Sequence, residues 1–104
     1  MLMRKIAALI SFLSLSSCVV AAPPPFDDYT IARAAIRAAQ DVDSARFSPG
    51  LWNKADENYR NGQKAYKDSD FADAKIYFKK ATDFAERAGN ATRLKKFQTG
   101  DSFP

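Results

Sequence analysis

The strongest nucleophile that this sequence offers is the thiol of Cys18, because the 104 residues contain one Cys and no His. The lack of His removes the usual general base of hydrolases and the commonest metal ligand. One Cys cannot form a disulfide within the chain. Pairs of carboxylates occur at Asp27-Asp28, Asp41 with Asp43, and Asp56-Glu57. Each pair lies among charged or capping residues, so we expect no catalytic site, no metal site and no cofactor.

The residues before Cys18 have the order of an export signal. Arg4 and Lys5 precede an apolar stretch, Ile6 to Leu15, and Ser16 and Ser17 follow it. A short basic region, an apolar region and small residues in this order are typical of a signal peptide. We therefore expect residues 1–17 to be a cleaved signal peptide.

The run Leu15-Ser16-Ser17-Cys18 resembles the bacterial lipobox. The resemblance implies that the thiol receives a diacylglyceryl group, that cleavage occurs before Cys18, and that the new amine is acylated. Several acyl chains hold a protein stably on a bilayer, whereas one does so only marginally. An Asp directly after the lipidated Cys resembles an inner-membrane retention signal, but this sequence has Val19 at that position. We therefore expect the anchored chain to lie at the periplasmic face of the outer membrane.

Two other fates of the N-terminus remain open. Val19-Val20-Ala21 has the small and apolar residues that an ordinary signal peptidase needs, and cleavage there would release a soluble periplasmic protein. An uncleaved anchor from Ile6 to Ala22 would have 17 residues with four serines, which is short of the ~20 residues that cross hydrocarbon.

The predicted mature chain is only weakly basic. Loss of Arg4 and Lys5 leaves 14 of the 16 Lys and Arg against 12 Asp and Glu, a net charge of +2. This charge and the export signal argue against nucleic acid as a partner. The remaining basic residues gather late, at Lys75, Lys79, Lys80, Arg87, Arg93, Lys95 and Lys96. They form either a solvated helix face or a contact with anionic lipid head groups or envelope polymers, for which Lys75, Lys79 and Lys80 are the candidates.

The predicted mature chain begins with a spacer between the membrane and the domain, and a first helix follows. We expect residues 18–26 to be the lipidated Cys and a Pro-rich spacer, because consecutive prolines favour extended geometry. The helical domain then covers residues 27–98. Asp27 and Asp28 suit a helix start, and the spacing of the apolar residues predicts a helix from Tyr29 to Ala45.

The second predicted helix begins at Ser48-Pro49, a favoured N-cap followed by a favoured first helical residue. One stripe of this helix alternates aromatic and small residues: Trp52, Ala55, Tyr59, Gly62 and Tyr66. We expect the stripe to face a core. Gly62 is then either a point of close helix approach or a hinge.

The third predicted helix follows Ser69-Asp70 and runs from Phe71 to Ala88. Gly89-Asn90 either stops it or lies within a continuation to about Lys96. Residues 99–104 are expected to be a disordered tail. The aromatic residues alternate with Ala as a bundle core requires, so the predicted fold is an all-α, three-helix antiparallel bundle.

Three sets of residues carry a resemblance to a known family: Tyr29, Ala32, Ile36 and Ala39; Phe47-Ser48-Pro49 with Leu51, Trp52 and Ala55; and Ser69-Asp70-Phe71 with Ala74 and Ala81. In this order behind a lipobox they resemble the bacterial lipoprotein family described as domain of unknown function 4398. The last two helices also resemble a single tetratricopeptide-like hairpin, through Gly62, Ala74, Phe78 and Ala81. One unit does not imply a superhelix.

These features predict a protein that binds rather than catalyses. We expect a lipid-anchored module whose helices contact another envelope protein. The alternative is a structural envelope protein that contacts peptidoglycan or lipid head groups through its basic helix face.

Overall fold

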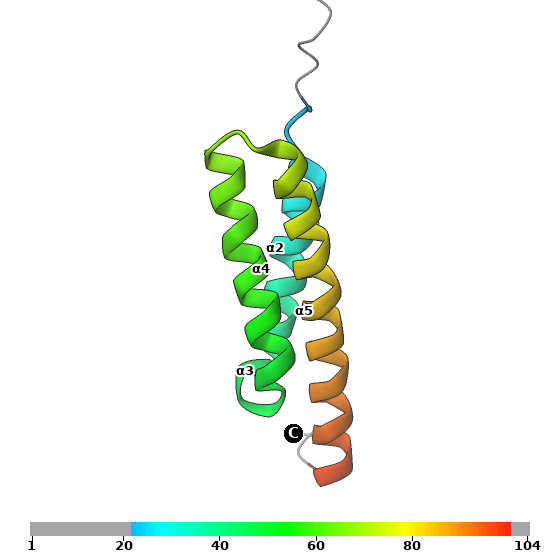
Figure 1. Cartoon of the computed structure of the whole chain (residues 1–104). Coiled ribbons are helices and arrows are strands. Elements are labelled where there is room, and N and C mark those ends of the chain that lie inside the picture. The colour runs from blue at the N-terminus through cyan, green and yellow to red at the C-terminus, as the bar shows by residue number, and fades with distance from the viewer. Residues whose placement is uncertain (1–21, 101–104) are drawn as a thin grey trace, which may run out of the picture.

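The computed structural model describes residues 22–100, and this part of the chain is an all-α bundle with no β-strand (Figure 1). Its elements are α2 (Phe26–Asp41), α3 (Ser44–Phe47), α4 (Pro49–Lys67) and α5 (Phe71–Thr99). The predicted fold class is confirmed. The predicted signal peptide, Cys18 and residues 101–104 lie outside the described residues.

Helix α5 is the element on which the other two long helices pack. α4 contacts it most extensively and α2 less so, and α2 and α4 contact each other least. α2 and α5 run in the same direction and α4 runs in the opposite one (Figure 1). The α4–α5 pair is therefore an antiparallel hairpin, as the sequence predicted for the last two helices.

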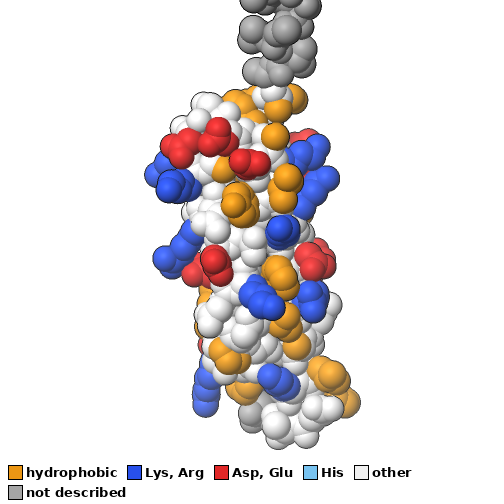
Figure 2. Space-filling model, viewed as in Figure 1, with side chains coloured by type: hydrophobic (Ala, Val, Ile, Leu, Met, Phe, Trp, Pro, Cys, Tyr) orange, Lys and Arg blue, Asp and Glu red, His pale blue; other side chains and the backbone are white. Residues whose placement is uncertain are grey.

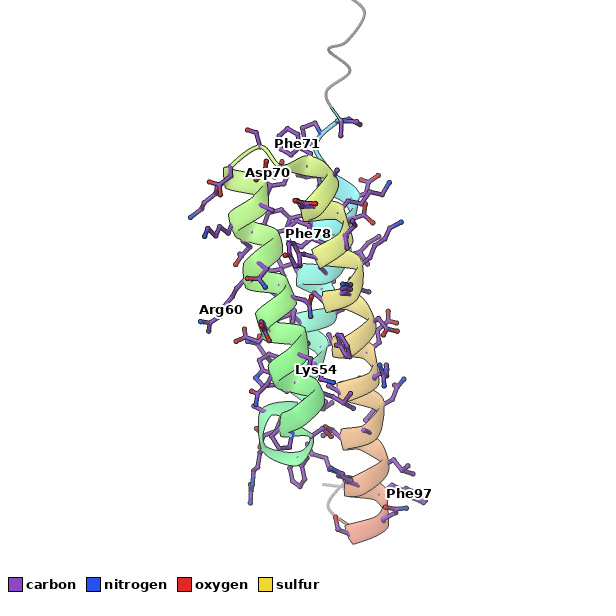
Figure 3. All side chains as sticks on the ribbon, viewed as in Figure 1. Lys54, Arg60, Asp70, Phe71, Phe78 and Phe97 are labelled. Carbon is purple, nitrogen blue, oxygen red and sulfur yellow. The ribbon has the colours of Figure 1, made fainter. Side chains whose placement is uncertain are left out.

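The core is built around Phe78, which is fully buried and points inward between the helices (Figure 3). Its ring stacks on that of Tyr29 from α2, with centroids 4.4 Å apart. One buried cluster comprises Ala32, Ala65, Ala74, Phe78 and Ala81, and a second comprises Ile36, Ala39, Ala55 and Ala85. Tyr59 packs against both clusters, so the core is continuous along the bundle.

The predicted stripe on α4 does face this core. Ala55 and Gly62 are buried, and the three aromatic residues of the stripe are partly buried. A Cβ atom on Gly62 would lie 2.7 Å from two ring carbons of Phe78. The helix is continuous through Gly62. Close approach, and not a hinge, is therefore the role of this glycine.

The first helix is shorter than the sequence predicted. It ends at Asp41 instead of Ala45, and a turn at Val42 and Asp43 separates it from α3. Asp43 has a left-handed backbone (φ 65°, ψ 43°), and its N–H donates to the Gln40 carbonyl at 2.9 Å. Asp tolerates this conformation better than most residues, which explains how the chain turns here without a glycine.

The predicted boundary at Ser48-Pro49 is correct, and Ser48 is the N-cap residue, although its side chain does not form the cap. Pro49 is the first residue of α4, and the Ser48 carbonyl accepts from the Trp52 N–H at 2.9 Å. The side chain of Ser48 makes no capping hydrogen bond, and neither does that of Asp70 at the start of α5. Asp27 and Asp28 lie in the first turn of α2, which begins at Phe26, three residues before the predicted start at Tyr29.

Helix α5 continues through Gly89-Asn90 to Thr99 and ends at Gly100, which has a left-handed backbone (φ 79°). Of the two alternatives at Gly89-Asn90, the continuation is the one found, and it extends three residues beyond Lys96. Residue 99, predicted to begin the tail, is helical. Three hydroxyl groups hold this last part of α5 against the α3 region. The Thr92 hydroxyl oxygen lies 2.9 Å from Ser48 Oγ and 3.1 Å from Ser44 Oγ, and all three residues are buried.

Candidate functional site

The three lysines predicted to form a basic contact lie on α5 and are all exposed. Lys75 and Lys79 are one helical turn apart on the same face. Lys80 lies about 100° further around the helix axis. Basic and acidic side chains are interspersed over the face of the molecule seen in Figure 2. The three lysines therefore occupy two faces of α5 and do not form one patch.

Lys75 lies at the end of the bundle where the chain enters. It lines an open hollow together with Phe71, Asp28 and the prolines Pro23, Pro24 and Pro25. Asp27 lines the same hollow. The charge of Lys75 is therefore next to the segment predicted to be the spacer, and carboxylates share this position.

The aromatic side chains around Tyr29 contact one another in the core. Around Tyr29, the ring centroids of Tyr59 and Tyr66 lie at 6.0 Å and 5.2 Å in edge-on geometry. The Gln63 amide donates to the Tyr29 hydroxyl at 3.1 Å, and the Arg33 guanidinium lies 4.9 Å above the Tyr29 ring. Hydrogen bonding to the Tyr59 side chain, and then to Tyr29, raises the pKa of Arg33 above its ordinary value. These rings serve the core, as predicted.

An open groove runs between the parallel helices α2 and α5, and we call it the α2/α5 groove. Its lining residues are Ile31, Ala34, Ala35, Ala38 and Ala39 from α2 and Ala85, Glu86, Gly89, Asn90 and Arg93 from α5. Ile31 is 54% exposed, and Ala34 and Ala38 are also exposed. Because most of these side chains are small, the backbone of an added helix can approach closely.

The rim of the α2/α5 groove carries one acid and one base on α5. The Arg93 guanidinium donates to Asn90 Oδ1 at 3.3 Å and lies above Gly89, where a Cβ atom would be 3.4 Å away. The ion pairs within residues 22–100 are Arg60 with Asp56 and Arg87 with Asp83, both at the predicted spacing of four. Neither Glu86 nor Arg93 has an ion pair there.

The sequence did not predict this groove, because the apolar spacing of each helix was assigned to a single core face. The signal was present in α2, where Ile31, Ala34 and Ala38 repeat at helical spacing beside the predicted core face. Alanines are also good helix formers, so their presence alone did not mark a surface.

The described residues contain no group of three acidic or Cys side chains that is arranged to hold a metal ion. None of the helices between residues 22 and 100 combines the length and the apolar character that crossing a bilayer requires.

Searches of protein-family models, of curated proteins and of solved structures found no match to this chain. The resemblance to the lipoprotein family and to a tetratricopeptide-like hairpin therefore stays a prediction from the residues quoted above.

Proposed function

We propose that this chain is a lipoprotein anchored through Cys18 at the periplasmic face of the outer membrane, where its helices bind another envelope protein. The observation that carries the binding part is the α2/α5 groove, an exposed apolar groove on a bundle whose core is already continuous. Support for the anchor comes from the sequence Leu15-Ser16-Ser17-Cys18 behind its apolar run.

The groove suits a helix as its occupant. Alanines on both walls allow close approach, and the exposed Ile31 offers an apolar side chain for the partner to cover. Complete burial of such a side chain stabilises a complex by roughly 1.5 to 3 kcal/mol before association costs. A helical partner that covers the groove over several turns would therefore gain most of its affinity from apolar contact.

The anchor is tested by Cys18→Ser. We expect this variant to keep the size of the precursor and to leave the membrane fraction, because no other side chain in the sequence can form a thioether with the lipid. Ser17→Ala is the matched control, since Ala is common at this lipobox position, and it should be processed and retained. Normal processing and membrane retention of Cys18→Ser would contradict the proposed anchor.

The groove is tested by a photo-crosslinking side chain placed at Ala38 in intact cells. An adduct with another polypeptide is expected from Ala38, which lines the groove. Arg37 is the control, because it is exposed but lies about 100° around α2 from Ala38. Equal adducts from both positions, or none from Ala38, would contradict a binding role for the groove.

The second candidate function is a structural contact with peptidoglycan or lipid head groups through Lys75, Lys79 and Lys80. The position of Lys75 beside the prolines of the predicted spacer favours it. We expect the triple change of these lysines to Gln to leave membrane association intact if the groove is the functional surface. Weakened association with membrane or cell wall, with no such loss when Lys64 and Lys67 on α4 are changed to Gln, would favour the second candidate.

A further inference from the structure

We propose that the occupant of the α2/α5 groove is a second copy of this chain, docked antiparallel so that Glu86 of each copy pairs with Arg93 of the other. This inference rests on the proposed function in using the same groove. It adds the identity of the partner and the direction in which it docks.

The rim charges point to this arrangement. Glu86 and Arg93 are seven residues apart, so they lie on nearly the same face of α5 and about 10 Å apart along its axis. A twofold axis that passes beside α5, perpendicular to the helix and level with the midpoint between them, brings each acid of one copy next to the base of the other. A parallel arrangement would instead place identical residues at the same level. The two charges of each copy, which have no ion pair in the described chain, thus form two ion pairs between the copies.

The position of this twofold axis also suits close packing. It falls at Gly89-Asn90, where Gly89 has no side chain and lines the groove. The Arg93 side chain, which lies above Gly89, is exposed and bonded only to the Asn90 amide at 3.3 Å. It can therefore turn to the Glu86 carboxylate of a second copy without breaking a buried contact.

Charge reversal tests the pairing in the full chain, expressed with two different affinity tags and recovered from membranes. Glu86→Arg and Arg93→Glu should each reduce co-purification of the two tagged copies at least tenfold, because each variant places like charges together. The mixture of the two single variants should associate again, since position 86 of each copy then faces the opposite charge at position 93 of the other.

The double variant Glu86→Arg with Arg93→Glu should also associate with itself. Both positions are exposed, so the changes leave the core intact. Wild-type chains that do not co-purify, single variants that associate like wild type, or a mixture and a double variant that fail to recover would each overturn the proposal.

The photo-crosslinking side chain at Ala38 separates this inference from the proposed function. An adduct with the mass of two copies supports both. An adduct with a different polypeptide, and none with a second copy, overturns the inference and leaves the proposed function in place. The absence of any adduct overturns both.

Discussion

At position 62 the absence of a side chain lets α4 lie directly against the ring of Phe78. The ring is fully buried and also stacks on Tyr29, so it cannot move away from α4 without losing contact with α2. Gly62 costs about 1 kcal/mol relative to Ala in a helix interior. The close packing of three helices around the ring of Phe78 requires a residue without a side chain at this position, which explains the glycine.

Enlarging position 62 should therefore destabilise the fold. We expect Gly62→Leu to lower the free energy of unfolding by roughly 1 to 3 kcal/mol, because the added side chain overpacks the core. Gly62→Ala should also be destabilising, by about 1 kcal/mol, since displacement of the Phe78 ring outweighs the gain in helix propensity. Urea unfolding of a chain that begins at residue 22 measures both.

Gly50 provides the control for this prediction. It lies in the first turn of α4, and nothing occupies the space within 4 Å of an added Cβ atom. Gly50→Ala should leave stability unchanged or raise it slightly. If Gly62→Ala were as stable as wild type, the ring of Phe78 would not be fixed as described.

Among the elements, the long helices were predictable and their ends were not. Periodic apolar residues located the helices, and Pro49 marked the start of α4, because these signals are local. The turn at Val42 and Asp43 has neither Gly nor Pro, so the local sequence did not predict it. The sequence left the end of α5 open at Gly89, and the buried contacts beyond it, of Thr92 with Ser44 and Ser48, join residues more than 40 positions apart.

The candidate sites also differ in whether neighbouring residues in the sequence mark them. The prediction for Cys18 rests on its neighbours in the sequence alone. The α2/α5 groove exists only because two helices that are far apart in the chain lie side by side, and no window of sequence contains it. The lysines at 75, 79 and 80 are close in sequence but lie on two faces of one helix.

The contact of Ser44 and Ser48 with α5, which we call the joint between α3 and α5, should be stabilised by the Thr92 hydroxyl. Thr92→Val keeps the shape but removes the hydrogen bonds to the buried Ser44 and Ser48, and we expect a loss of about 1 to 2 kcal/mol in the free energy of unfolding. Thr82→Val is the control: its hydroxyl is part-buried and bonds only to the Phe78 carbonyl, so its loss should be within about 0.5 kcal/mol, a typical surface effect. Equal effects of the two changes would show that the buried hydroxyls do not stabilise the joint.

For the molecule as a whole, the continuous core predicts cooperative unfolding. Trp52 packs against the cluster that contains Ile36 and Ala85, whereas Phe78 belongs to the other cluster, and Tyr59 contacts both. Fluorescence of Trp52 and helical circular dichroism should therefore follow the same denaturation curve. The chain from residue 22 should also give a mainly helical spectrum. Two separate transitions would mean that the two clusters unfold independently.

The contact between Tyr29 and Phe78 also orders the events of folding. It joins residues 49 positions apart, whereas α4 and α5 are linked by a three-residue turn. Closing the shorter loop costs less conformational entropy, so the α4–α5 hairpin is expected to form first and α2 to dock onto it last. The α2/α5 groove comes into existence only at that final step. Whatever binds the groove therefore slows the release of α2, and amide hydrogens of α2 should exchange with solvent more slowly in the complex than in the free protein.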